Sequence, residues 1–104
     1  MNIYLNEQDA VYDLHKKGYN NDFHLFGNDL LWVQKKIFIR AETISIIECH
    51  RFCNTAGPPK EIIVFGIALV RHNVKGIMLN DYSDYTTKMP TVITKKLEEL
   101  LLNT

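Results

Sequence analysis

Two cysteines and a histidine fall within the five-residue stretch 49–53, CHRFC. Thiolates and imidazoles are common zinc ligands, and paired thiols can be redox-active, so this stretch could hold a metal or a redox site. In an extended strand, however, Cys49 and Cys53 share a face about 13 Å apart, because each residue advances the strand by about 3.3 Å. His50 points to the other face, so the three side chains cannot close around one ion and the thiols cannot bridge. The spacing favours an ordinary buried cysteine beside an exposed histidine.

A second polar group follows a predicted strand, in the stretch 81–85, DYSDY. Two carboxylates and two phenols at a strand end could bind a polar ligand or a cation, although Asp and Ser also make turns and Tyr often packs at the rim of a core. Polar residues at 48–51 come near this stretch if the strand that carries them pairs with the central hairpin. The candidate ligand-binding residues are therefore Glu48, His50, Arg51, Asp81, Tyr82, Asp84 and Tyr85.

Nucleophilic catalysis needs a base beside the nucleophile and a third group that orients the base. Ser45 and Ser83 stand in no recognisable nucleophile turn, and neither has a histidine placed beside it. His15, His24 and His72 fall on a predicted helix, strand and turn, and they form no close ligand spacing. The sequence therefore predicts no catalytic residues, no metal ligands and no cofactor.

A nearly uninterrupted apolar run at 62–70 is the segment that the rest of the chain must cover. One face of this predicted strand carries small residues, Gly66 and Ala68, which let a helix approach closely, so we expect helices on that side. The large residues of the other face are Ile63, Phe65, Ile67 and Leu69. Because both faces are apolar, the strand is expected to be buried on both sides.

A second apolar run at 74–79 follows a polar break at 71–73, which predicts a central β-hairpin. The sequence does not decide the length of the loop between these two strands. A two-residue loop would pair Arg71 with Val74, whereas a three-residue loop would pair Val70 with Val74. The choice decides which residues of the two strands share a face.

Cap and turn residues place the other elements. Asn6 is a good N-cap and Gly18 a good stop for a helix at 6–17, and Pro90 opens a last helix at 90–103. Further strands are expected at 23–26, 30–34, 37–39 and 43–52. The order α-β-β-β-β-β-β-α predicts one α+β domain over 1–104, with two layers. Its antiparallel sheet has five or six strands, and the N-terminal and C-terminal helices lie on one face.

The strand at 43–52 mixes apolar and polar residues. Regular alternation places Ile44, Ile46, Glu48, His50 and Phe52 on one face. The opposite face then carries Thr43, Ser45, Ile47, Cys49 and Arg51. Charges in the later half suit a strand whose end emerges into solvent.

Composition limits the partners. The 12 basic and 12 acidic side chains cancel, so no overall field attracts nucleic acid or an anionic membrane, and neither is expected as a partner. No apolar stretch is long enough to span a bilayer, and the first ten residues lack the pattern of a signal peptide. We therefore expect a cytoplasmic protein whose two cysteines form no disulfide framework.

Several motifs together resemble a family of small uncharacterised proteins of Bacteroidetes. They are Lys16-Lys17-Gly18-Tyr19 with Asp22-Phe23, Glu42 with Arg51-Phe52, and VKGIMLNDYSDY before a Pro-led helix. The resemblance covers most of the chain and implies a bacterial source; where Ala41 stands, the family often has proline. Some members are labelled phosphoribosylpyrophosphate synthetase. That enzyme is much longer, and this chain has no glycine-rich phosphate cradle. The family brings no catalytic residues.

These observations predict a non-catalytic binding or protein-interaction module, whose protein partner the sequence does not name. The alternative, which the family label implies, is a small enzyme or ligand-binding domain for a phosphorylated or nucleotide-like compound. A homodimer is also expected. If both helices cover one face, Phe65 and its large neighbours face water on the other, and a soluble monomer rarely exposes so large an apolar patch. A second copy would cover it across a two-fold axis.

Overall fold

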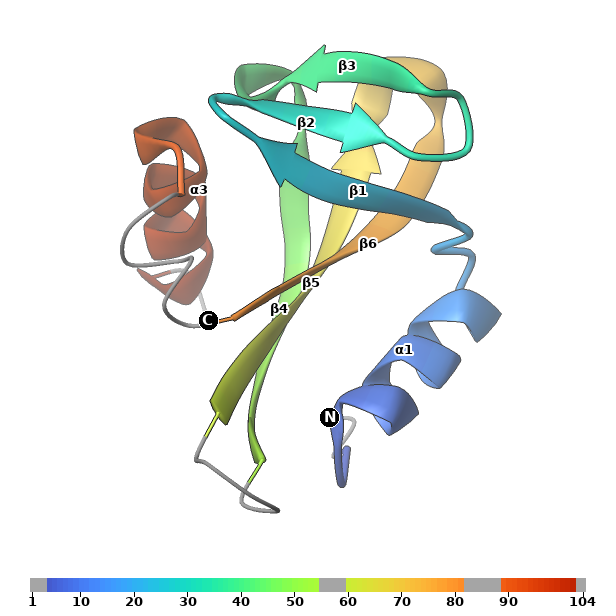
Figure 1. Ribbon diagram of the computed structural model, residues 1–104, viewed down its shortest axis with the longest axis vertical. Coiled ribbons are helices and arrows are strands. Elements are labelled where there is room, and N and C mark those ends of the chain that lie inside the picture. Colours follow the sequence, from blue (N-terminus) through green and yellow to red (C-terminus); the bar gives the residue numbers. More distant parts are fainter. Residues whose placement is uncertain (1–3, 55–59, 82–88, 103–104) are drawn as a thin grey trace.

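Six strands and two α-helices make up the described part of the chain, residues 4–54, 60–81 and 89–102 of this computed structural model (Figure 1). In chain order the elements are α1 (Glu7–Lys16), β1 (Asn21–Phe26), β2 (Asp29–Trp32), β3 (Ile37–Arg40), η1 (Ala41–Thr43), β4 (Ser45–Asn54), β5 (Lys60–Leu69), η2 (Val70–His72), β6 (Val74–Asp81) and α3 (Thr91–Leu102). The predicted α+β class and the α-β-β-β-β-β-β-α order are confirmed.

The six strands form one sheet in the order β3-β2-β1-β6-β5-β4. Two antiparallel units, β1–β3 and β4–β6, meet where β1 runs parallel to β6, with Phe23 opposite Met78. The prediction of a purely antiparallel sheet is therefore wrong. Turn residues in the sequence predict antiparallel pairing between strands that are neighbours in the chain, whereas β1 and β6 are distant in the chain and pair in parallel. Gly76 makes the joint possible, because a Cβ there would lie 2.2 Å from Phe23 Cε2 and 2.6 Å from the Asn21 carbonyl oxygen.

The two helices pack on opposite faces of the sheet, not on one face as predicted (Figure 1). Ile93 and Leu97 of α3 share the larger core cluster with Phe65 of β5. Leu14 of α1 belongs to a smaller cluster with Val64 on the other side of β5. Each apolar face of β5 is thus covered by one helix. The expectation of helices on the side of the small residues Gly66 and Ala68 holds for α1 but not for α3.

This arrangement removes the argument that led to the homodimer. The face predicted to be exposed in a single chain carries Ile63, Phe65, Ile67 and Leu69, and all four are buried. Phe23, Leu30 and Trp32 of the β1–β3 unit belong to the same cluster, so the curled sheet and α3 cover that face together. No second copy is needed to bury it.

The turn of the central hairpin differs from both predicted loops. Leu69 pairs with Val74, so four residues connect the strands, and three of them form the short helix η2. Asn73 completes the loop with φ at 53°, a left-handed conformation that Asn tolerates better than most residues. The longer loop puts Gly66 opposite Ile77.

A bulge in β4 reverses part of the predicted face assignment. Ile46 pairs with Ile67, but the next pair joins Glu48 to Gly66, so Ile47 is the extra residue. Each bulge residue shifts the alternation by one. Ile46 therefore faces the α3 side, whereas Glu48 faces the α1 side. Regular alternation had placed them on the same face.

Capping interactions fix α1 as the sequence predicts. The Asn6 side chain accepts a hydrogen bond of 2.9 Å from the Asp9 backbone N–H, and Gly18 follows the helix with φ at 99°. The reversal lets the Tyr19 N–H donate to the Leu14 carbonyl at 3.0 Å. The Tyr19 side chain is thereby directed beneath the helix, towards β4 and β5.

Candidate functional site

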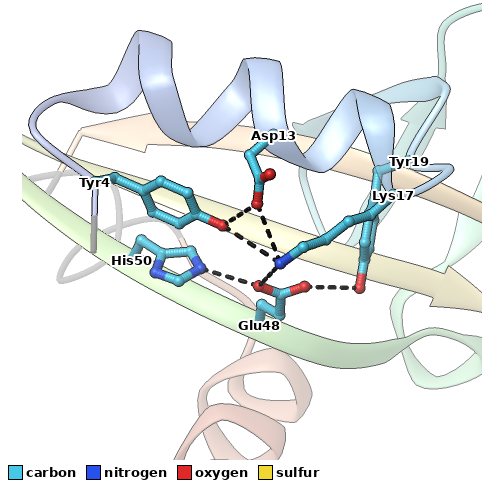
Figure 2. A network of polar contacts seen from close by, with 6 residues as sticks. All are labelled: Tyr4, Asp13, Lys17, Tyr19, Glu48 and His50. Atoms are coloured by element: carbon cyan, nitrogen blue, oxygen red, sulfur yellow. Dashed lines mark hydrogen bonds and ion pairs between the residues drawn. The ribbon is translucent and has the colours of Figure 1, made fainter. Parts of the chain in front are cut away.

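Six polar residues meet between α1 and the sheet (Figure 2). We call this group, Tyr4, Asp13, Lys17, Tyr19, Glu48 and His50, the α1 network. Four of its members come from the N-terminal segment and α1 with its C-terminal turn, and two come from β4. The bulge at Ile47 is what turns Glu48 towards them.

Glu48 lies at the centre of the network (Figure 2). Its Oε2 accepts a hydrogen bond of 3.2 Å from the Tyr19 hydroxyl, and its Oε1 lies 3.1 Å from His50 Nε2 and 3.8 Å from Lys17 Nζ. The Glu48 side chain is 24% exposed. A carboxylate this far out of water needs several partners, and here it has three on two elements.

The second half of the network ties the N-terminal segment to α1. The Tyr4 hydroxyl donates a bond of 2.5 Å to Asp13 Oδ2, and Lys17 Nζ lies 3.1 Å from the same oxygen and 3.4 Å from Tyr4 Oη. The rings of Tyr4 and His50 meet edge to face at 4.8 Å. Lys17 thus bridges the two carboxylates, so the helix, the N-terminal segment and β4 are joined in one set of contacts.

Gly66 allows the Tyr19 ring to pack closely against β5. A Cβ at Gly66 would lie 3.0 Å from Tyr19 Cε1 and 3.4 Å from Glu48 Cβ. Lys75 Nζ lies over the Tyr19 ring, 4.9 Å from the ring centre. Tyr19 is 1% exposed, so the small face of β5 serves to accommodate this ring as well as α1.

Three members of the network, Asp13, Lys17 and Tyr19, have pKa values shifted so as to favour the form that each group already holds at neutral pH. The hydrogen bond from Tyr4, followed by that from Lys17, lowers the pKa of the Asp13 carboxyl. The hydrogen bond to Asp13 raises the pKa of Lys17, despite some desolvation. Burial, with the nearby charge of Glu48, raises the pKa of Tyr19 to about 12. At neutral pH, Lys17 is therefore charged and Tyr19 protonated, so neither is a free nucleophile or base.

The pKa of Cys49 is also shifted so that its unreactive form is favoured. Burial raises the pKa of the Cys49 thiol to about 11, and the reactive form of a thiol is the thiolate. Cys49 packs against the larger core cluster, Cys53 is exposed, and both are free. The prediction of an ordinary buried cysteine beside an exposed histidine holds only in part, because Cys49 is partly buried against the core and His50 is partly buried rather than exposed. Within the described residues, no group of three His, Cys, Asp or Glu side chains is placed to hold a metal ion.

The predicted ligand-binding residues separate in space. Glu48 and His50 do lie together. Arg51 belongs to the opposite face of β4, where its Nε donates to Glu61 Oε1 at 2.7 Å. Asp81 lies four residues along β6 from Ile77, the neighbour of Gly66, which is about 13 Å in a strand. Tyr82, Asp84 and Tyr85 lie outside the described residues.

Sequence reasoning missed the four members of the network near α1. The helix was placed from its cap residues alone, although Asp13 and Lys17 stand four residues apart, the spacing of a helical ion pair. Tyr19 directly after the helix-stopping Gly18 was a further signal, since the residues that follow such a stop turn back onto the helix. Nothing local connects either feature to Glu48.

A different region, formed by Ile37 and Phe38 of β3 with Phe26 of β1, has large apolar side chains exposed to solvent, and we call it the β3 edge. β3 is the last strand on one side of the sheet. Ile37, Phe38 and Phe26 are 49%, 58% and 63% exposed there, and the rings of Phe26 and Phe38 lie 5.0 Å apart. A pocket of about 260 Å³ adjoins the edge. It is lined by β3, by Thr43, and by Leu69, Arg71 and His72 at the end of the central hairpin.

Comparison with known proteins gives no match: no protein-family model, curated protein or solved structure aligns with the chain. Neither described helix has the length and apolar character needed to cross a bilayer.

Proposed function

We propose that the protein is a non-catalytic binding module that acts through protein contacts in the cytoplasm. The observation that carries this proposal is the β3 edge, where three large apolar side chains are about half exposed beside an open strand. Apolar side chains gathered at one place on a surface are typical of an interaction site. The α1 network adds support, because its polar groups are directed at one another, with Lys17 held charged and Tyr19 held protonated.

A ligand screen tests the class of function. The folded protein is heated with peptide pools, with nucleotides, with ribose phosphates and with divalent ions, and the midpoint of unfolding is measured. Any compound that binds only the folded state must raise that midpoint. Peptide pools are expected to raise it. A rise with ribose phosphates or nucleotides, and none with peptides, would overturn the proposal.

The second candidate is a ligand-binding domain for a small phosphorylated compound. It is favoured by the pocket lining, which includes Arg71 and His72 and, among the described residues, no carboxylate. The volume argues against it, because pockets for small molecules usually enclose about 300–1,000 Å³ and this one encloses about 260 Å³. It suits a side chain better than a nucleotide.

The homodimer stays a prediction without its first physical reason, since Phe65 is buried within the chain. Sedimentation equilibrium of the wild type over micromolar concentrations tests it directly. A monomeric mass throughout that range would end the proposal of a homodimer, and would leave the binding module with a different protein as its partner.

A further inference from the structure

The outer side of β3 offers backbone groups for another strand. In an edge strand, half of the N–H and C=O groups point away from the sheet. Among the described residues, the only side-chain hydrogen bond to the backbone of β3 is made at its end, where the Thr43 hydroxyl donates to the Arg40 carbonyl at 2.7 Å. The segment Ile37–Ile39 is thus open to pairing.

The other edge of the sheet is protected from such pairing. β4 is interrupted by the bulge at Ile47, and Arg51 on this strand is held by Glu61 of β5. Bulges and charged side chains are the usual means by which proteins prevent strand addition at an edge. β3 has neither device along Ile37–Ile39, and Phe38 stands in the middle of this segment. The comparison selects β3 as the edge that can accept a strand.

The charge around β3 selects an acidic partner. Lys35 and Lys36 precede the strand, and Arg71 and His72 line the adjoining pocket. Arg40 is already paired with Glu42 at 2.7 Å, so among the described residues that line the pocket, Arg71 is the arginine whose charge is available. A second copy of β3 would bring the same cations against each other, and like charges across an interface are unfavourable. A carboxylate-bearing segment would be attracted instead.

We infer that the β3 edge binds an extended acidic peptide by strand addition. This inference rests on the proposed binding function and names its partner class. Backbone hydrogen bonds to Ile37–Ile39 supply the pairing, an apolar side chain of the peptide packs on Phe38, and a carboxylate reaches Arg71 through the pocket. In this mode the main chain gives affinity and alternate side chains give specificity.

The probe is an acetylated and amidated peptide with the sequence Thr-Val-Glu-Val-Glu-Val-Thr, titrated into the isotope-labelled full chain. Amide resonances of Ile37–Ile39 are expected to shift, and the outward N–H groups among them to exchange more slowly with solvent. The same peptide with lysine in place of glutamate is expected to bind at least about tenfold more weakly. A fully N-methylated glutamate peptide, which cannot donate backbone hydrogen bonds, is expected not to bind.

Two variants separate the site from the rest of the surface. Arg71→Glu is expected to weaken binding of the glutamate peptide about tenfold and to improve binding of the lysine peptide. Lys95→Glu makes the same change of charge on the exposed side of α3 and is expected to leave both affinities unchanged. Equal weakening by both variants would mean that only the net charge matters, and would overturn the inference.

The outcomes distinguish this inference from the proposed function. Shifts confined to β4 or α1 would leave the binding module standing and remove the β3 edge as its site. Undiminished binding of the N-methylated peptide would exclude strand addition. If ribose phosphate shifts Arg71 and His72 while no peptide does, the pocket is a small-anion site and both proposals fail.

Discussion

The α1 network and the β3 edge are two regions of one sheet with opposite properties. In the network, charged and hydroxyl groups from α1, β4 and the N-terminal segment are directed inward at one another (Figure 2). At the β3 edge, aromatic and aliphatic side chains face solvent, and a cationic pocket lies beside them. The polar residues that resemble a catalytic cluster have their hydrogen-bond and ionic partners within the protein. The apolar residues of the β3 edge are the ones that remain exposed for contact with another molecule.

The difference shows what a group of polar side chains can mean. A catalytic site keeps at least one group poised for a substrate, with its pKa near the working pH. In the α1 network the pKa values of Lys17 and Tyr19 are raised further above neutral pH, so Lys17 is held charged and Tyr19 protonated. Such a network positions a helix. The comparison therefore predicts that mutations in the network change stability, whereas mutations at the β3 edge change binding.

Among changes within these two regions, removing the central carboxylate is expected to have the largest effect on stability. Glu48→Ala leaves the buried Tyr19 hydroxyl without its acceptor and takes one anionic partner from Lys17. Because an unsatisfied polar group costs more than its hydrogen bond contributed, we expect a loss of about 3 kcal/mol in the free energy of unfolding. Urea denaturation of the variant and the wild type measures it.

Glu61→Ala is the matched control for this experiment. It removes a carboxylate from the neighbouring strand, where the side chains of the pair, Arg51 and Glu61, are 54% and 32% exposed. Pairs of this kind contribute about 0–1 kcal/mol. If both variants lost the same stability, the α1 network would be no more than another surface ion pair, and the comparison of the two regions would fail.

Alkaline pH is expected to loosen the network through Tyr19. Its pKa is raised from 10.0 to about 12 in the folded chain, so the folded state holds the proton where the unfolded state releases it. Stability is therefore fully present below pH 10 and falls as the pH rises towards about 12. The shift corresponds to about 3 kcal/mol at most.

Ultraviolet titration of tyrosinate, together with unfolding at several pH values, checks this expectation. Tyr19→Phe removes the ionisation and keeps the ring, so its stability is expected to fall less steeply above pH 10 than that of the wild type. Parallel slopes for the two proteins would show that the alkaline loss arises elsewhere.

Filling the space beneath the Tyr19 ring is expected to have a smaller effect. In Gly66→Ala the new methyl group would lie 3.0 Å from Tyr19 Cε1, so the ring must move by a few tenths of an ångström. Overpacking of this kind costs about 1–3 kcal/mol. The better strand propensity of Ala offsets part of that, since Gly costs about 0.5–1 kcal/mol within a strand. We expect a net loss near 1 kcal/mol, and a gain in stability would contradict the close fit.

Local sequence signals predicted the elements well. Asn6 and Gly18 bound α1, and the Gly27 turn separates β1 from β2, because caps and turns depend on residues that are neighbours in the chain. The parallel pairing of β1 with β6 and the placement of α3 opposite α1 depend on distant contacts. No local pattern encodes them.

The site was predicted only in part for a related reason. Glu48 and His50 stand two residues apart on one strand, so their proximity follows from alternation alone. The bulge at Ile47 decides whether Glu48 and His50 lie on the α1 side or the α3 side of the sheet. Hydrophobic periodicity does not reveal such an inserted residue. Their partners Tyr4 and Lys17 come from the other end of the chain. Only the three-dimensional arrangement brings them to β4.

The smallest change in stability is expected at the β3 edge. Phe38→Thr keeps a residue type that favours strands and removes a side chain that is 58% exposed. It loses the ring contact with Phe26 at 5.0 Å, a solvated contact, so the free energy of unfolding should fall by less than about 1 kcal/mol. Phe65→Thr makes the same replacement in the core, where the ring is fully buried. That variant should lose about 3–5 kcal/mol.

Measuring both properties on this pair sharpens the comparison. Phe38→Thr should unfold almost as the wild type does and yet lose binding of the acidic peptide, because the ring on which the peptide packs is gone. A Phe38→Thr variant that lost as much stability as Phe65→Thr would place Phe38 in the core of the fold rather than on a binding edge. One that kept full peptide affinity would show that the exposed ring has no part in recognition, and the open character of the β3 edge would need another explanation.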